Sequence, residues 1–174
     1  MCKCLSKYLI DANIFIESAL RYYAFDICPG FWDWLKIVSI EKTHIKSVKK
    51  VLEEVKQPKE LSEFLKELNK NKFFIDENKI TPESFMAVAS KLEQMNYESE
   101  PISEFSSGAD FFLIALAYQD HYKIVTHEKR ADNTRKRIKI PNVCQELGIE
   151  CINVADLLRD EKIKFHYTHN NLFS

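Results

Sequence analysis

Short apolar runs alternate with longer amphipathic stretches along the chain, and this alternation limits the fold more than any other feature. Runs of strand length lie at residues 8–10, 73–75, 123–126 and 149–152, and a further strand is expected around 44–45. Between them, apolar side chains recur at the three- and four-residue spacing of helices. Strands separated by helices indicate a parallel sheet, because a parallel neighbour needs a crossover connection. We therefore expect an α/β protein with three layers, α/β/α, around a central, mostly parallel sheet.

Turn and cap residues predict where several helices begin. Pro29, Pro82 and Pro141 each suit the first position of a helix, where the missing N–H costs nothing. Ser47 is expected to cap a further helix. Residues 96–107 show no apolar periodicity and are expected to form a loop.

The length of 174 residues predicts a single domain, residues 1–174, with a helical insert at about 57–105 and a tail at 162–174. Apolar residues make up 45% of the chain, which excludes a disordered protein. The helix that carries Phe31 and Val38 has an apolar stripe, which we expect in the core; a homodimer contact is the alternative.

Three classes of enzyme are excluded by the glycines: Gly30, Gly108 and Gly148 are the only 3 in the chain, and they stand too far apart for the Gly-rich motifs of Rossmann, P-loop or nucleophile-elbow proteins. No stretch approaches the ~20 apolar residues of a membrane span, and Asp11 interrupts the first apolar run. We therefore expect no membrane contact and a cytoplasmic location. The 5 cysteines are an odd number, which favours free thiols.

Acidic residues stand where strands end and where a buried helix begins. Asp11 follows the first strand, Glu128 follows KIVT by two residues, and Asp110 opens the apolar stretch FFLIALAYQ; Glu53 or Glu54 can reach in from a helix. The carboxyl ends of parallel strands share one edge, so these side chains are expected to meet. Each acid alone also suits a turn, a cap or a solvated face. Together, with no basic residue within five positions of Asp110, they favour a bound cation, and oxygen ligands favour Mg or Mn.

Three segments resemble the signature segments of PIN-domain nucleases, a superfamily that includes the VapC-like toxins of toxin-antitoxin pairs. They are YLIDANIFIE at 8–17, GADFFLIALA at 108–117 and KIVTHE at 123–128, and their order and spacing also agree. Within that superfamily, CPGFWDWLK at 28–36 and KIPNVCQELG at 139–148 are similar to a PIN-like subgroup described as a domain of unknown function. The resemblance implies a PIN-like three-layer fold.

The resemblance also implies roles for individual residues. The V-x-x-E pattern of the family selects Glu54 over Glu53. The implied metal-ligating and catalytic acids are Asp11, Glu54, Asp110 and Glu128.

Two polar residues match positions that support those acids: Asn13, which would orient water or the scissile phosphate, and Thr126, whose hydroxyl would hydrogen-bond the cluster. The family usually has T-x-D where this chain has Thr126-His127-Glu128. Asp132 is therefore an alternative candidate for the fourth acid. The sequence also leaves open whether the site binds one metal ion or two.

The function implied by the resemblance is metal-dependent hydrolysis of RNA phosphodiester bonds by an endoribonuclease, with a cognate antitoxin as partner if the chain is the toxin of a pair. A catalytically weak or inactive PIN-fold module that binds RNA or protein is the alternative, because Glu128 departs from the family pattern. A haloacid-dehalogenase-type phosphatase is disfavoured, since that chemistry needs an acid where this chain has Asn13.

Basic residues gather directly after the last acid. Residues 123–139 carry seven Lys and Arg against Glu128 and Asp132, a local net charge of +5, while residues 76–110 carry −6. The formal net charge of −1 is therefore a cancellation between segments. A solvated loop is the alternative, but the position beside Glu128 favours contact with RNA phosphates. The expected RNA-binding residues are Lys129, Arg130, Arg135 and Arg137.

Overall fold

The sheet at the centre of the protein is entirely parallel. The computed structural model describes residues 6–131 and 135–166. Within them five strands pair in the order β3-β2-β1-β4-β5, and each pairing is parallel. This confirms the expected α/β class and sheet. The strands are β1 (Tyr8–Ile10), β2 (Ile45–Val48), β3 (Phe74–Ile75), β4 (Lys123–Val125) and β5 (Cys151–Ile152).

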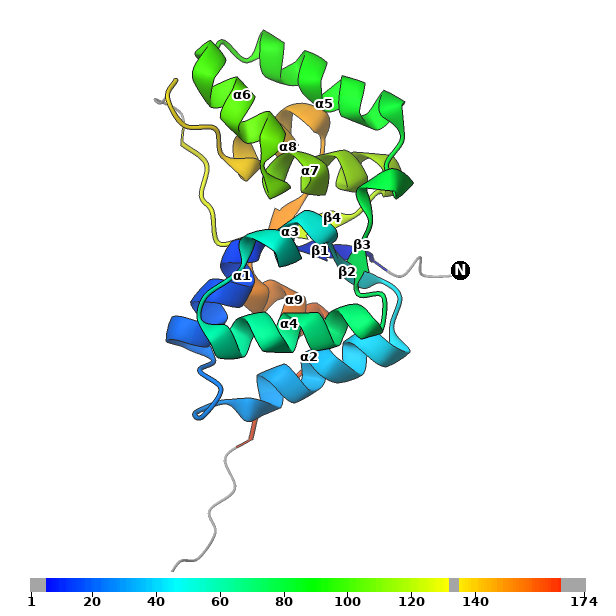
Figure 1. Ribbon diagram of the computed structural model, residues 1–174, viewed down its shortest axis with the longest axis vertical. Helices are drawn as coiled ribbons and strands as arrows, with labels where there is room; N and C mark the ends of the chain where they lie inside the picture. Colours follow the sequence, from blue (N-terminus) through cyan, green and yellow to red (C-terminus); the bar gives the residue numbers. More distant parts are fainter. Residues whose placement is uncertain (1–5, 132–134, 167–174) are drawn as a thin grey trace, which may run out of the picture.

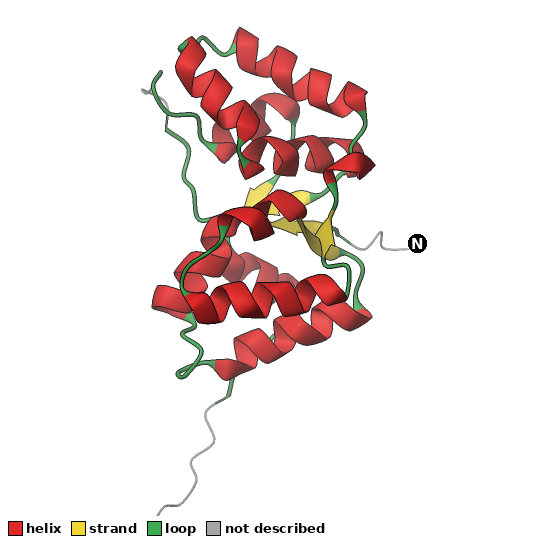
Figure 2. Ribbon diagram, in the orientation of Figure 1, coloured by secondary structure: helices red, strands yellow, loops and turns green. Residues whose placement is uncertain are grey.

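Helices cover both faces of this sheet and complete the three layers (Figures 1 and 2). The lower layer in Figure 1 contains α1 (Ala12–Glu17), which continues into the π-helical turn η1 (Ser18–Tyr22), α2 (Pro29–Glu41), α4 (Lys59–Lys70) and α9 (Val154–Asp160). The upper layer contains α5 (Pro82–Gln94), α6 (Ser99–Ser107), α7 (Ala109–Asp120) and α8 (Ile140–Leu147). The short α3 (Lys49–Glu54) follows β2, and the 3-10 turn η2 (Glu77–Lys79) follows β3.

The strand order places a topological switch point between β1 and β4. From β1 the chain first builds the sheet toward β2 and β3, and it later returns to add β4 and β5 on the other side. In open parallel sheets the crevice for ligands lies at such a point, beyond the carboxyl ends of the strands. Ile10 is in register with Val125, and the Asp11 N–H donates to the Val125 carbonyl at 3.0 Å. Asp11 and Thr126 therefore leave the sheet side by side.

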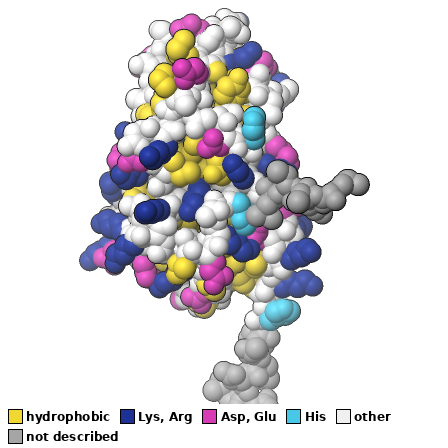
Figure 3. Space-filling model, turned by 90° about the vertical axis from the view of Figure 1, so that its right-hand side faces the viewer, with side chains coloured by type: hydrophobic (Ala, Val, Ile, Leu, Met, Phe, Trp, Pro, Cys, Tyr) yellow, Lys and Arg dark blue, Asp and Glu magenta, His cyan; other side chains and the backbone are white. Residues whose placement is uncertain are grey.

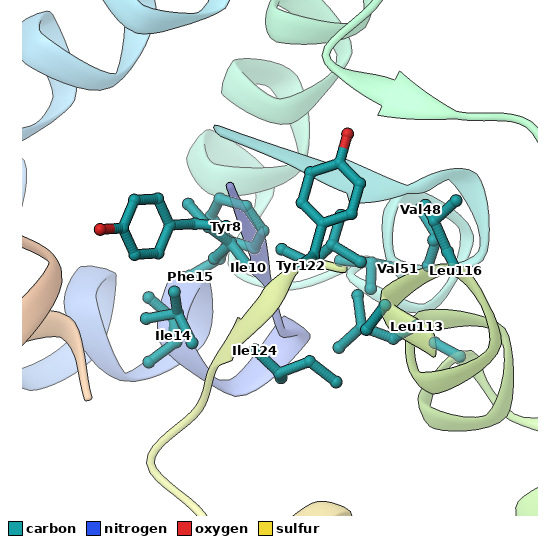
Figure 4. Close-up of a cluster of buried hydrophobic side chains, with 14 of the residues drawn as sticks. Tyr8, Ile10, Ile14, Phe15, Val48, Val51, Leu113, Leu116, Tyr122 and Ile124 are labelled. Atoms are coloured by element: carbon teal, nitrogen blue, oxygen red, sulfur yellow. The ribbon is translucent and has the colours of Figure 1, made fainter. Parts of the chain in front are cut away.

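The core explains why α7 has so little polar sequence. Figure 4 shows Leu113 and Leu116 of α7 on one side of the central strands and Ile14 and Phe15 of α1 on the other. All four side chains are buried. A helix covered by both the sheet and the other upper helices has no solvated face to keep polar. Asp110 thus stands at the start of α7, directly before the wholly apolar residues 111–117.

The apolar stripe of α2 belongs to the core. Phe31, Trp34, Leu35 and Val38 are all less than a tenth exposed, so these side chains face the interior. Phe31 also stacks on Tyr23, with ring centroids 4.4 Å apart. The face that suggested a homodimer contact is therefore filled by the chain's own residues.

Two local expectations are wrong. Residues 99–107 form helix α6 where a loop is expected, because Phe105 is buried and Ile102 packs one turn earlier, and Pro101 falls in the first turn, where it is tolerated. Ser47 does not cap a helix. It lies within β2, where its hydroxyl donates to the Ile10 carbonyl at 2.6 Å and ties β2 to β1.

The helices of the described ranges are all too short or too polar to cross a bilayer. On the face that Figure 3 shows, Lys and Arg side chains are interspersed with Asp and Glu. That face carries no broad field of one sign, in keeping with a near-neutral total made of separate segments.

Candidate metal and nucleic-acid site

Asp11 is the most deeply buried acid of the site. It follows β1 and is 3% exposed. The Thr126 hydroxyl donates to Asp11 Oδ2 at 2.8 Å. Burial raises the pKa of Asp11 to about 7 and the charge of Glu128 adds to the rise, while the hydrogen bond from Thr126 acts in the opposite direction. A carboxylate in this position needs a positive partner if it is to stay ionised.

Hydrogen bonds of Asn13 and Thr126 join the residues that follow β1 to those that follow β4. Asn13 Nδ2 donates to Thr126 Oγ1 at 3.0 Å, and Asn13 Oδ1 accepts the His127 N–H at 3.1 Å. The Glu128 N–H donates to the same Thr126 oxygen at 3.1 Å. Both polar ends of the Asn13 amide thus bind the chain after β4, so the side chain holds the geometry of the acids.

Asp110 and Glu54 meet at the start of α7. The Ala109 N–H donates to Glu54 Oε1 at 2.8 Å, which ties the end of α3 to the first turn of α7. Burial raises the pKa of Asp110 to about 8, and repulsion from Asp11, Glu128 and Glu54 adds to it. Among the described residues no hydrogen-bond donor reaches the Asp110 carboxylate. The four acids expected from the sequence are therefore close enough to repel one another.

Glu128 differs from the other acids because both of its oxygens are engaged. The Lys139 ammonium pairs with Oε1, and the Ile140 N–H, at the start of α8, donates to Oε2 at 2.9 Å. The α8 N-terminus and a lysine thus balance its charge. The alternative fourth acid, Asp132, lies outside the described residues.

The donor chemistry of the site fits a hard divalent cation, although the side chains are not arranged as a finished cage. Within the described part of the chain, no three His, Cys, Asp or Glu side chains form a ready metal-binding group. The reason is that Glu54 and Glu128 each turn an oxygen toward a backbone N–H. Asp11, Asp110 and Glu54 still offer carboxylate oxygens from three elements, which suit Mg or Mn.

A cavity of about 390 Å³ opens onto these acids. Glu54, Asp110 and Glu128 line it, and α6 adds Glu104. Arg137, with its neighbour Lys136, forms a basic wall. The cavity thus combines carboxylates with cations that suit a phosphate chain.

The expected RNA-binding residues do not all lie at this cavity. Arg137 does, whereas Arg130 and Arg135 line a separate cavity of about 740 Å³ beside Tyr97. Lys129 lines a third cavity, of about 340 Å³, together with Glu128 and residues of β5. All four side chains are exposed. Of the four, Arg137 therefore shares a cavity with Glu54 and Asp110, Lys129 shares one with Glu128, and Arg130 and Arg135 line a cavity that none of the four acids lines.

Two residues of the site were missed in the sequence. The pattern places Lys139 among the basic residues and gives no sign of its pair with Glu128. Its signal is a cation directly before a helix, where the helix dipole disfavours it unless an acid lies near. Glu104 falls in residues 96–107, where the sequence predicts a loop and the structure has α6. Its signal is the spacing of Ile102 and Phe105, which places an apolar stripe beside it.

His127 stands beside the site, where its backbone N–H donates to Asn13 Oδ1. Its ring packs on Tyr22 with centroids 5.3 Å apart. Burial lowers the pKa of His127, and Nε2 has no hydrogen-bond partner among the described residues. The imidazole is therefore neutral near pH 7.

Fold and site together define a three-layer α/β protein with an acidic centre at its switch point. The chain belongs to the family described as Domain of unknown function (DUF4411), which matches residues 8–165. That range holds β1 through α9 and all of the acids described above. The search of curated proteins and the search of solved structures found no match.

Proposed function

We propose that this protein is a Mg- or Mn-dependent endoribonuclease that hydrolyses RNA phosphodiester bonds at the acidic centre. The observation that carries the proposal is the meeting of Asp11 and Asp110 at the switch point of a parallel sheet, with pKa values raised to about 7 and about 8. Buried acids that repel one another are costly to keep unless they serve a charged ligand. The resemblance to PIN-domain nucleases supports the same reading.

The residues of the chain have separable tasks in this mechanism. Asp11 and Asp110 would hold the cation, and Glu54, which the Ala109 N–H binds at one oxygen, would complete the ligand set. Thr126 and Asn13 keep Asp11 in place through the hydrogen bonds at 2.8 and 3.0 Å. A bound Mg or Mn would activate the attacking water and neutralise charge on the phosphate.

The basic residues of the cavity would set the path of the bound phosphate chain. Lys136 and Arg137 line the same cavity as Glu54 and Glu104. A phosphate chain would follow the cations and avoid the acidic α6 side, since backbone phosphates are bound mainly by Lys and Arg. This arrangement supports a nucleic acid as the substrate class, and the resemblance to PIN-domain nucleases favours RNA. The cations do not select a base, because phosphate contacts carry no sequence information.

The test is cleavage of single-stranded and structured RNA by the purified protein with Mg, with Mn or with EDTA. Asp11→Asn and Asp110→Asn should each reduce the rate by at least about 100-fold. Glu53→Gln is the matched control, because Glu53 is a surface acid of the same helix as Glu54 and should keep the wild-type rate. Cutting in EDTA, or full activity in both Asn variants, would refute the proposal.

The second candidate is a module that binds RNA without cutting it. It is favoured by one observation: Glu128 is already neutralised by Lys139 and the α8 N-terminus. Fluorescence anisotropy with labelled RNA separates the two. Binding that persists in EDTA, with no cleavage in Mg or Mn, identifies the module.

A role as the toxin of a toxin-antitoxin pair follows from the resemblance and belongs to the same proposal. Expression of the wild-type chain would then arrest growth, and Asp11→Asn would relieve the arrest. Normal growth on expression of an RNA-cleaving protein would show a nuclease with another task. A partner that inhibits the toxin would need a basic or metal-chelating segment to enter the acidic cavity.

A further inference from the structure

Lys139 lies close to the acids of the candidate site. It directly precedes α8, its side chain is 19% exposed, and its ammonium pairs with Glu128, which is 16% exposed. Its charge also reaches Asp110, where it partly offsets the repulsion from the other carboxylates. The described structure therefore places a fixed positive charge inside the proposed metal centre.

The Lys139 pair divides the four acids into two groups. Glu128 accepts from Lys139 at one oxygen and from the Ile140 N–H at the other, so its negative charge is already balanced and the ammonium would repel a metal ion placed beside it. Asp110 carries no donor among the described residues, and Asp11 and Glu54 retain lone pairs beyond the hydrogen bonds they accept. Three acids remain for a cation, and the fourth is held by a lysine.

Two metal ions in a nuclease centre stand about 3.5–4 Å apart, and each supplies positive charge to one side of the phosphate. A lysine ammonium is a compact point charge on a flexible stem and can meet a phosphate oxygen as a metal ion does. Lys139 is anchored at Glu128, the position at which the fourth acid would hold a second ion.

We propose that the centre binds one divalent cation, through Asp11, Glu54 and Asp110, and that the Lys139 ammonium takes the place of the second. This inference rests on the proposed nuclease function. Lys139 would contact the phosphate directly, with Glu128 as the residue that positions it. The number of metal ions, which the sequence leaves open, is then one.

The stoichiometry of Mn²⁺ binding tests this without any cleavage. Mn²⁺ is titrated into the purified full-length protein, and free Mn²⁺ is followed by electron paramagnetic resonance. The wild type should bind one ion per chain, and Lys139→Arg, which keeps the charge, should also bind one. Lys139→Met frees Glu128 and should bind two. Lys36→Met is the matched control, because it removes a lysine from an exposed pair with Glu67 and should leave the count at one.

Each result of the Mn²⁺ titration either supports or overturns the inference. Two ions in the wild type, or one ion in folded Lys139→Met, overturn the inference and leave the nuclease proposal standing. No ion in the wild type refutes the metal centre itself and therefore the proposed function. If Lys139→Met does not fold, Glu128→Gln takes its place: it keeps the ammonium and removes its anchor, and the count should stay at one, whereas two would overturn the inference.

Cleavage gives a second readout for an active protein. At low Mn²⁺ the wild-type rate should rise with the first power of the ion concentration, and the Lys139→Met rate with the second power. Lys139→Met with one ion bound should cleave about 100-fold more slowly than the wild type. A rate within about threefold of the wild type would show that the ammonium does not act on the phosphate.

Discussion

The Thr126 hydroxyl donates to Asp11 Oδ2 at 2.8 Å across the β1–β4 boundary, inside the protein. Thr126 is 4% exposed and Asp11 3%, so water cannot replace this bond. The same hydroxyl oxygen accepts from Asn13 and from the Glu128 N–H. One side chain therefore joins the residues that leave both strands at the switch point.

Thr126→Val keeps the shape of the side chain and removes the hydroxyl, so it should lower the free energy of unfolding by about 1–3 kcal/mol. The cause is the loss of the hydroxyl that donates to the buried Asp11 carboxylate and accepts from Asn13 Nδ2. Urea unfolding measures the change. Thr126→Ser, which retains the hydroxyl, is the control, and a Val variant as stable as the wild type would show that the bond is not needed to hold Asp11.

Asp110→Asn should stabilise the metal-free protein. The folded pKa of Asp110 is about 8, above its ordinary value, so the folded protein holds a proton that the unfolded chain has released. The protonated Asp110 side chain therefore contributes fully to the stability of the folded protein below about pH 4, and this contribution is lost as pH rises toward 8. In EDTA at pH 8 we expect the variant to be more stable by about 1–3 kcal/mol, and the gain to shrink toward pH 5.

Thermal unfolding with and without Mn²⁺ checks this prediction. Mn²⁺ should raise the midpoint of the wild type and leave that of Asp110→Asn nearly unchanged, because the variant lacks a ligand. Glu53→Gln should behave as the wild type does in both conditions. A variant less stable than the wild type at pH 8 would mean that Asp110 is held by a favourable partner.

The sequence predicts the sheet and the helix starts well because these depend on local signals. Pro29, Pro82 and Pro141 fall at the first or second position of α2, α5 and α8. Thr81 accepts from the Ser84 N–H, as a capping residue does. Gly148, at φ +68°, ends α8 in the left-handed conformation that suits glycine.

The contacts around the acids could not be predicted, because they depend on tertiary packing. The pattern indicates that Glu128 and Asp110 lie near Asp11, but it says nothing of the ion pair between Glu128 and Lys139, which stands 11 positions later in the sequence. The α6 helix could not be predicted for a related reason. It is stabilised by burial of Phe105 against its neighbours, and its own sequence is mostly polar. The spread of Lys129, Arg130 and Arg135 over other cavities likewise follows from the path of the loop.

Glu161 should make the protein sensitive to acid. Burial alone would raise its pKa, but hydrogen bonds from Lys42 and His44 outweigh this and lower it. An acid with a depressed folded pKa stabilises the protein above its unfolded pKa of about 4.3 and loses that contribution as pH falls further.

Glu161→Gln should therefore cost about 1 kcal/mol at pH 6 and little at pH 3. Urea unfolding between these values measures the difference. Glu150→Gln, in an exposed pair with Lys123, is the control and should change stability by less than about 0.5 kcal/mol. An equal cost of Glu161→Gln at both pH values would contradict the prediction.

Phe105→Ala should loosen the wall that α6 gives to the acidic cavity. Phe105 is 8% exposed, and its carbonyl accepts the Gly108 N–H at 3.1 Å, directly before α7 and Asp110. We expect a loss of about 2–4 kcal/mol in the free energy of unfolding, below the upper end for a phenylalanine because the site lies at the margin of the core. Met86→Ala, at a side chain that is 68% exposed, should cost less than about 0.5 kcal/mol.

Hydrogen exchange should speed up at residues 99–109 in Phe105→Ala while β1 and β4 stay protected, since α6 rests on α7 and not on the sheet. Equal protection of α6 in both variants would show that the helix is held by contacts other than Phe105.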